Sequence, residues 1–485
     1  MFYGREKEMD SLLRLWKKRT ASFVTCRGRR RIGKSRLVEE FAARSGCRFI
    51  EIAGLAPRPK MDNAAQLANF AEQLVAQSEL PQSISPKSWA EAFAFLHAAI
   101  RDAERTVVLL DEVSWMGKWD PDFAGMLKNA WDKQLKHHDR LVLVVCGSVS
   151  TWINRNILES SAFAGRLSLN VTLDELPLAD CVRFWGRKTH RLSVRDVLDV
   201  LSVTGGVPKY LEEIDPSDSA DENARRLCFA PGGPLVEEFG QIFSEIFEDS
   251  APAKKAILRA LSGGALTAGA IAEKISADRN GHLSRHLSEL EAAGFIAGDC
   301  GLNPETGKPA KIASYRIRDN YTRFYLHHME PRLEAIKAGT FAFETLDRMA
   351  GWQTMLGLQF EALVVNHWRE LLPRINHGGG LVLSAAPYRK PARGKEPGVQ
   401  IDLLLQMRNA AVVVEIKRKA FLDESVEEEV ERKVAALRLT GRKSVRTALV
   451  CDGTLSPAVR EGGYFDSIVP FADLLGMQAY SRSGN

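Results

Sequence analysis

The strongest constraint on this chain is a loop bounded by two glycines near its N-terminus. Residues 28–35 read G-R-R-R-I-G-K-S, between an apolar strand pattern at 22–26 and a helix pattern at 36–43. In this context the loop N–H groups and the helix N-terminus converge on a phosphate. We therefore predict a P-loop for ATP and Mg²⁺, with nucleotide-binding residues Gly28, Arg29, Arg30, Arg31, Ile32, Gly33, Lys34, Ser35 and Arg36.

Individual side chains of this loop have distinct expected roles. The Lys34 amine reaches the β- and γ-phosphates, and the Ser35 hydroxyl ligates Mg²⁺. The three arginines at 29–31 add positive charge whose partner the sequence leaves open. They are solvated, or they contact a neighbouring subunit or nucleic acid.

A second half of the nucleotide site is expected at the ends of two further strands. The run 106–112, T-V-V-L-L-D-E, indicates a buried parallel strand that ends in Asp111 and Glu112. We expect Asp111 to hold Mg²⁺ through water and Glu112 to polarise the attacking water. The alternative is an ordinary strand with acids at its solvent end. The apolar run 140–146 is followed by Gly147 and Ser148, and Ser148 is a candidate sensor of the γ-phosphate.

One arginine suggests a site shared between subunits. Arg166 precedes a strand pattern at 167–173 and is a candidate arginine finger for a neighbour's nucleotide. A plain surface arginine is the competing interpretation. The finger interpretation predicts a homo-oligomer.

Five segments in a fixed order resemble a known family. They are F-Y-G-R-E-K-E at 2–8, the loop at 28–35, L-D-E at 110–112, G-R at 165–166 and G-G-V-P-K-Y-L at 205–211. Together they resemble the archaeal-type AAA-like ATPases, which are close to the signal-transduction (STAND) NTPases. The resemblance covers roughly the first half of the chain. It implies an ASCE-class α/β core with a helical lid, Pro208 in that lid near the nucleotide, and Gly4 and Arg5 near the adenine.

The middle of the chain resembles a winged helix. Helix patterns at 253–262, 266–275 and 282–293 precede a hairpin pattern that ends at 315–317. Thr267 is a plausible N-cap, and Gly294 is expected to end the third helix. Such a third helix can enter a DNA major groove, but winged helices also serve as packing modules. The exposed candidates for DNA contact are His282, Ser284, Arg285, Ser288, Lys308 and Lys311.

The last third of the chain carries a second set of acidic residues. Strand patterns at 400–405 and 412–417 flank a turn at Arg408-Asn409, and this register places Asp402 opposite Glu415. Strand alternation puts Lys417 on the same face as Glu415. Two carboxylates and an amine at one point suit metal-assisted phosphodiester hydrolysis, with Asp402 and Glu415 as Mg²⁺ ligands.

The surrounding pattern resembles a nuclease core. A helix at 358–365 offers Glu361, and the order helix, three strands, helix, strand matches the PD-(D/E)xK restriction-endonuclease-like fold. By this resemblance Glu361, Asp402, Glu415 and Lys417 are the catalytic residues. A degenerate nuclease fold kept for binding is the alternative. The basic stretch 388–395 either follows a phosphate backbone or is a solvated loop.

Composition limits the class of protein. The 485 residues include 66 Lys and Arg against 61 Asp and Glu, and 45% are hydrophobic, which argues against a disordered chain. Seven scattered cysteines form no C-x-x-C pair, so a reduced cytoplasmic protein is expected. No charged-to-apolar signal pattern or membrane-length apolar run is found, so no membrane association is expected.

The whole chain is therefore expected to be a multidomain α/β protein. The predicted parts are an ASCE P-loop core at 1–175, a helical lid and linker at 176–232, a winged helix at 233–330 and a PD-(D/E)xK nuclease-like domain at 331–485. The favoured function is an ATP-dependent, Mg²⁺-dependent nuclease acting on nucleic acid, with DNA favoured. The alternatives are an ATP-driven switch that binds DNA or protein without cleavage, and a nucleotide-loaded scaffold with negligible turnover.

Overall fold

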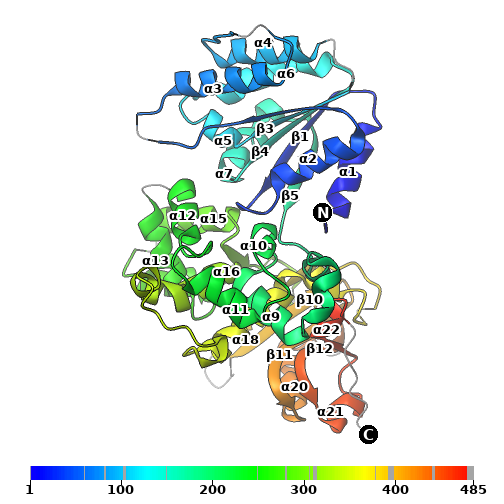
Figure 1. The fold of residues 1–485 in the computed structure, drawn as a ribbon. Coiled ribbons are helices and arrows are strands. Elements are labelled where there is room, and N and C mark those ends of the chain that lie inside the picture. Colours follow the sequence, from blue (N-terminus) through cyan, green and yellow to red (C-terminus); the bar gives the residue numbers. More distant parts are fainter. Residues whose placement is uncertain are drawn as a thin grey trace.

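The computed structural model has two lobes joined after strand β5, and the N-terminus lies between them (Figure 1). The upper lobe contains the first 175 residues, and the lower lobe contains the rest. The residues that the structure describes are 2–58, 60–80, 83–101, 105–148, 150–247, 250–278, 281–304, 306–309, 314–376, 378–390, 398–439 and 443–477.

A five-stranded parallel sheet forms the centre of the upper lobe. Its strands lie in the order β2-β3-β4-β1-β5, so that β4 separates the strand before the P-loop from the strand that ends in Asp111. This is the ASCE arrangement that the family resemblance implies. The strands are β1 (Ser22–Gly28), β2 (Arg48–Ala53), β3 (Thr106–Asp111), β4 (Leu141–Gly147) and β5 (Leu167–Leu173).

Helices cover both faces of this sheet. Helices α3, α4 and α6 pack with Phe23, Ile52 and Leu110 into one apolar core, and α1 and α2 pack with Val24 and Leu109 into another. Alternate residues of the same strands therefore face opposite cores, which explains the continuous apolar runs. The helices are α1 (Glu6–Trp16), α2 (Lys34–Ser45), α3 (Asn63–Ala76), α4 (Trp89–Ile100), α5 (Val113–Met116), α6 (Phe123–Lys133) and α7 (Ser150–Ile153).

Helices and a small sheet form the upper part of the second lobe. The winged-helix prediction is confirmed: α13, α14 and α15 accompany the sheet β6-β8-β7, in which β6 lies between α13 and α14 in the chain. Thr267 caps α14 by accepting from the N–H of Ala270, and Gly294 follows α15 with φ +82°. The elements are α8 (Leu178–Arg183), α9 (Val194–Thr204), α10 (Pro208–Glu212), α11 (Ala220–Ala224), α12 (Glu238–Phe247), α13 (Ala251–Leu261), β6 (Leu266–Thr267), α14 (Ala268–Lys274), α15 (Gly281–Ala292), β7 (Ile296–Asp299) and β8 (Ser314–Ile317).

The C-terminal part is a mixed five-stranded sheet in the order β13-β12-β11-β10-β9. Strands β9, β10 and β11 are antiparallel, whereas β11, β12 and β13 are parallel. The elements are α16 (Asn320–Phe324), α17 (Leu333–Lys337), α18 (Trp352–Asn366), α19 (Trp368–Leu371), β9 (Ser384–Lys390), β10 (Val399–Gln406), β11 (Ala410–Leu422), α20 (Ser425–Leu437), β12 (Ser444–Leu455), α21 (Pro457–Glu461), β13 (Ser467–Pro470) and α22 (Phe471–Leu474).

One apolar core runs through the whole lower lobe. It extends from Leu176 to Leu475 and joins the lid, the winged helix and one face of the C-terminal sheet. The C-terminal part of the predicted lid and linker, 176–232, is packed rather than a free linker, because it contains α11 and buries Leu227 and Phe229 in that core. The many polar residues of this segment give no local signal of that burial. No helix among the described residues has the length and apolarity needed to cross a membrane.

Candidate functional site

Three residues of the P-loop have positive φ values, a backbone conformation that few residue types adopt readily. Gly28 has φ +151°, and a Cβ there would lie 2.5 Å from the carbonyl oxygen of Leu173. Gly33 has φ +89° and ends the loop at the first turn of α2. Arg31, between them, also has a positive φ, +69°. The two glycines thus permit the turn, and the loop delivers Lys34 and Ser35 to the helix N-terminus.

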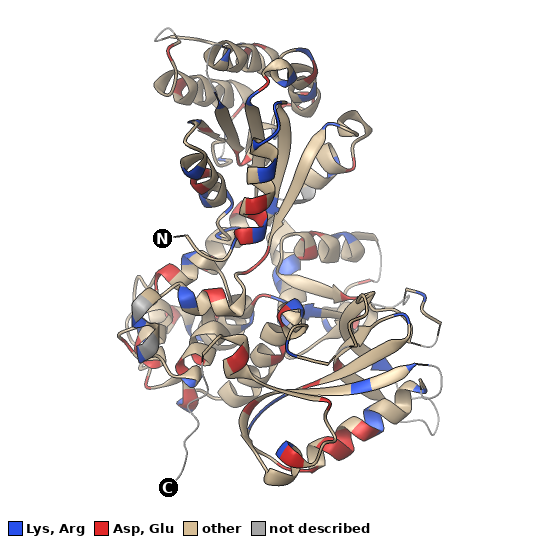
Figure 2. Ribbon diagram, turned by 90° about the vertical axis from the view of Figure 1, so that its right-hand side faces the viewer, with Lys and Arg blue, Asp and Glu red and all other residues tan. Residues whose placement is uncertain are grey.

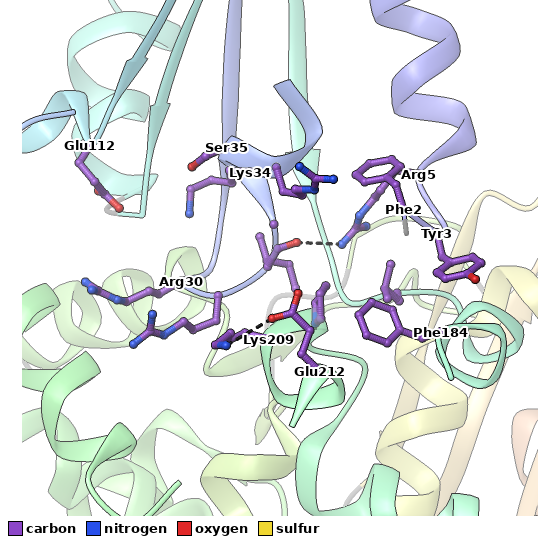
Figure 3. Close-up of a pocket in the computed structure, with 16 residues that line it drawn as sticks. Phe2, Tyr3, Arg5, Arg30, Lys34, Ser35, Glu112, Phe184, Lys209 and Glu212 are labelled. Atoms are coloured by element: carbon purple, nitrogen blue, oxygen red, sulfur yellow. Dashed lines mark hydrogen bonds and ion pairs between the residues drawn. The ribbon is translucent and has the colours of Figure 1, made fainter. Parts of the chain in front are cut away.

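The loop borders a cavity of about 360 Å³ between the two lobes (Figure 3). Phe2, Tyr3 and Phe184 gather at one end of it, and Glu112 lies at the other, with Lys34 and Ser35 between. The aromatic end can take a base, and the polar end can take phosphates. The remaining lining residues are Arg5, Arg30, Arg31, Ile32, Gly33, Arg36, Leu176, Pro208, Lys209 and Glu212.

Arg5 and Pro208 both line this cavity. The buried Arg5 guanidinium donates to the carbonyl oxygens of Ile32 and Asp174, at 3.2 and 2.6 Å, and so ties the N-terminal segment to the loop. Pro208 starts α10, and its Cγ lies 4.0 Å from the position of a Cβ on Gly33. The lid therefore contacts the phosphate end of the cavity directly.

The predicted phosphate and metal residues contact one another. The Lys34 amine donates to the carbonyl oxygens of Gly28 and Arg29, both at 3.2 Å. The Ser35 hydroxyl donates to an Asp111 carboxylate oxygen at 2.5 Å. Two oxygen donors from different elements thus lie side by side at the end of the cavity, and this donor chemistry fits Mg²⁺.

Glu112 is held in an unusual conformation. Its φ of +48° is uncommon for a residue with a side chain, and one carboxylate oxygen accepts from both the N–H and the hydroxyl of Ser148, at 3.1 and 2.9 Å. Positive φ at such residues often occurs at functional sites. The proposed water-activating carboxylate and the proposed phosphate sensor are therefore partners here.

The first loop arginine is buried in an ion pair with the lower lobe. Arg29 pairs with Asp319, just before α16, and lies 4.0 Å from Glu175; the Asp319 side chain has no exposed surface. The guanidinium also lies 5.7 Å from the Tyr210 ring centre. Burial lowers the pKa of Arg29, but Asp319, Tyr210 and Glu175 together outweigh this and hold that pKa above its ordinary value. Sequence reasoning missed Asp319, whose only local signal is that it caps α16.

The other two arginines pair with helix α12. Arg31 donates two hydrogen bonds to Glu238, and Arg30 forms an ion pair with Glu245, about two turns further along α12. Tyr210 donates to the same Glu238 carboxylate at 3.2 Å. The partner that the sequence left open is thus the same chain: the arginines pair with Glu175, which follows β5, and with three acids of the lower lobe. We call Arg29, Arg30, Arg31 and their partners Glu175, Glu238, Glu245 and Asp319 the arginine clasp.

Arg166 lies away from the cavity of its own chain. It precedes β5, whose Leu167 pairs with Phe23 at the start of β1, whereas the P-loop follows the other end of β1. Its guanidinium donates two 2.8 Å hydrogen bonds to Asp132 of α6. Any contact of Arg166 with a nucleotide would therefore involve another subunit.

The winged-helix candidates are exposed on α15. His282, Ser284, Arg285 and Ser288 are all solvent-accessible there, as is Lys308 after β7, whereas Lys311 lies outside the described residues. Positive and negative residues are interspersed over both lobes in the view of Figure 2. Segment 391–397 of the predicted basic stretch also lies outside the described residues.

The predicted register of the C-terminal hairpin is confirmed. Leu403 pairs with Val414, and Met407 donates to the carbonyl of Ala410 across the turn. Asp402 accepts from the N–H of Ile416 at 3.0 Å, next to Glu415. Both carboxylates are buried.

Glu361 of α18 adds a third carboxylate near Asp402. Burial, and then Glu361, raises the pKa of Asp402 to about 6. Burial, and then Asp402, also raises the pKa of Glu415. Glu361 itself has its pKa raised by burial. The three carboxylates from α18, β10 and β11 are therefore close enough to interact electrostatically.

Helix α20 adds two residues that sequence reasoning missed. Lys433 donates to both Glu415 oxygens at 2.7 and 2.6 Å, and Lys417 lies 2.8 Å from one of them. Both amines also contact Glu429. The four-residue spacing of Glu429 and Lys433 marks one helix face, but nothing in the sequence aims that face at β11.

The C-terminal donors have oxygen chemistry that fits Mg²⁺, but their present arrangement is not a metal cage. Within the part of the chain that the structure describes, no three His, Cys, Asp or Glu side chains are grouped so as to hold a metal ion. Asp402 and Glu415 are the residues that would hold one, and the lysine amines occupy the oxygens of Glu415.

Comparison with known proteins supports the predicted ATPase domain and the predicted helix-turn-helix. Residues 2–214 match a family model described as an ATPase domain predominantly from Archaea, and residues 250–299 match a helix-turn-helix domain. The chain thus carries a P-loop ATPase domain, whose activity is ATP binding and hydrolysis, and a helix-turn-helix domain.

Two individual proteins are similar over much of the chain. An uncharacterised protein of Methanocaldococcus jannaschii, MJECL04, is 24% identical over 433 residues, which cover 88% of this chain and 89% of that protein. The solved structure of a Walker-type ATPase of Pyrococcus abyssi is 17% identical with a TM-score of 0.50, and the match covers 67% of this chain and 96% of that one. The second likeness concerns the fold alone.

The buried position of Asp319 predicts a large cost for removing its counter-ion. Arg29→Met should destabilise the protein by about 3 kcal/mol, because it leaves a carboxylate buried without its main partner. Thermal unfolding measures this, and adding Asp319→Asn should recover part of the loss. Arg348→Met removes an exposed ion pair with Glu344 and should cost at most about 0.5 kcal/mol. Equal losses for the two arginine variants would contradict the clasp.

Proposed function

We propose that the protein is an ATP-driven nuclease that cleaves nucleic acid, with DNA favoured, at a metal-dependent site in its C-terminal sheet. The observation that carries this proposal is the meeting of Asp402, Glu415 and Lys417 on two adjacent strands, with Glu361 of α18 near enough to raise the pKa of Asp402. The helix-turn-helix match supports DNA as the partner, since this motif is a common DNA-binding element.

The residues of the inter-lobe cavity have the roles that ATP hydrolysis requires. Lys34 leaves the loop carbonyls to contact the β- and γ-phosphates, and Phe2, Tyr3 and Phe184 offer faces for the base. Ser35 and Asp111 would hold Mg²⁺, which neutralises phosphate charge when bound. Glu112 orients the attacking water once its carboxylate leaves Ser148. Ser148 is then free to contact the γ-phosphate.

A chain of contacts supports coupling between the two sites. Arg29 of the P-loop pairs with Asp319, and Asp319 caps α16 by accepting from the N–H of Thr322. In α16, the backbone carbonyl of Asn320 accepts from the side-chain amide N–H of Gln359 at 2.8 Å. Arg323 of the same helix donates to the side-chain oxygen of Gln359 at 2.7 Å.

Gln359 lies in α18, two residues before Glu361. Phosphates that attract Arg29 or its neighbours would therefore weaken the clasp and shift α16 against α18. We infer that nucleotide turnover controls the C-terminal carboxylates in this way.

Roles at the C-terminal site follow from charge and position. Asp402 and Glu415 would hold the metal ion, which activates water and polarises the phosphodiester when bound. Lys417 orients that water and offsets negative charge, and Glu361 completes the acidic group. Arg166 lies where only a neighbouring subunit's nucleotide could use it, so the proposal includes a homo-oligomer.

A second function is favoured by one specific observation. Both Glu415 oxygens are already engaged by lysine amines. A protein that keeps this arrangement would be an ATP-driven switch that binds DNA or protein without cleaving it. ATPase activity and DNA binding without cleavage, across metals and substrate forms, would favour this function.

Glu112→Gln tests the ATPase assignment. We expect ATP turnover to fall by about 100-fold or more, since the amide cannot accept a proton or orient water as the carboxylate does. ATP affinity should be retained, because Lys34 and the loop are intact. Single-turnover hydrolysis and equilibrium nucleotide binding measure the two quantities. Turnover near that of the wild-type protein would remove Glu112 from the mechanism.

Lys417→Ala tests the nuclease assignment. Cleavage of DNA in the presence of Mg²⁺ or Mn²⁺ should be lost while ATP hydrolysis persists, because the two sites lie in different lobes. Lys419→Ala is the matched control, since Lys419 is an exposed residue of the same strand. It should cleave as the wild-type protein does. Cleavage retained in Lys417→Ala would overturn the assignment.

A further inference from the structure

The Lys433 amine occupies the place where a metal ion would bind Glu415. It lies 2.7 and 2.6 Å from the two carboxylate oxygens, and the Glu415 side chain has no exposed surface. A divalent ion that binds this carboxylate needs at least one of those oxygens at about 2.1 Å. The ammonium and the ion therefore compete for the same atoms.

Charge makes this competition strong. The amine and a divalent ion on the same carboxylate would be neighbouring cations, and their repulsion is screened little in a buried site. Lys433 also interacts with Asp402, the other proposed metal ligand. One ammonium thus counters both carboxylates.

Lys433 has an alternative partner within reach. Its amine lies 2.9 Å from Glu429, one turn earlier on α20, and Glu429 is partly exposed. A lysine amine on a flexible four-carbon stem can give up one carboxylate and keep the other. The displaced ammonium would thus remain paired.

We propose that Lys433 is a displaceable counter-ion that closes the metal site until its amine moves from Glu415 to Glu429. This inference rests on the proposed nuclease function. It assigns to α20 a role separate from the chemistry of Lys417. Metal binding at Asp402 and Glu415 then requires movement of one side chain, without a change of fold.

The test is Mn²⁺ binding by the nucleotide-free full-length protein, followed by loss of the free-ion electron paramagnetic resonance signal. Asp402→Asn defines the part of the binding that belongs to this site. Lys433→Met removes the ammonium and keeps the apolar stem, and should bind Mn²⁺ at least about tenfold more tightly. Lys433→Gln should act in the same direction, which guards against a variant that packs poorly.

Arg432→Met is the matched control. It removes one positive charge from the adjacent, exposed position of α20 and should leave Mn²⁺ affinity unchanged. Equal or weaker Mn²⁺ binding in both Lys433 variants would overturn the counter-ion role and leave the nuclease proposal standing. Absence of Asp402-dependent binding in every variant would overturn both.

Discussion

The buried ion pair between Arg29 and Asp319 is the interaction on which the arrangement of the two lobes depends. Both charges are removed from water, so neither side chain is stable there without the other. The pair fixes a P-loop residue against the segment that caps α16. It also explains why the loop needs arginine, since a planar guanidinium can face Asp319, Glu175 and the Tyr210 ring together.

Because of this ion pair, elements of the lower lobe contact the P-loop and the nucleotide cavity directly. The lid contributes Pro208 and Phe184 to the cavity, whereas α12 and the segment before α16 contribute acids to the clasp. The lid, the winged helix and one face of the C-terminal sheet share a core, so the proposed coupling passes from α16 to α18 through packed side chains and the Gln359 hydrogen bonds. In the proposed function, Arg29 of the P-loop thereby influences Asp402 and Glu415.

Local sequence rules could predict the P-loop, the strand before Asp111, the caps of the winged helix and the register around Asp402. Each depends on residues close in sequence, such as Gly33 at a helix start or the turn between β10 and β11. The partners of the loop arginines and the position of Lys433 could not be predicted, because they depend on how separate units pack. The burial of the polar segment that contains α11 could not be predicted for the same reason, because it depends on packing against residues that are far away in the sequence.

Hydrogen–deuterium exchange with and without a non-hydrolysable ATP analogue tests the central claim, that the nucleotide site is coupled to the lower lobe through the arginine clasp. The account predicts that the nucleotide changes amide protection in 28–36, in 319–325 and in α18. Protection that changes only in 28–36 would contradict it. The nucleotide site and the proposed nuclease site would then act independently of each other.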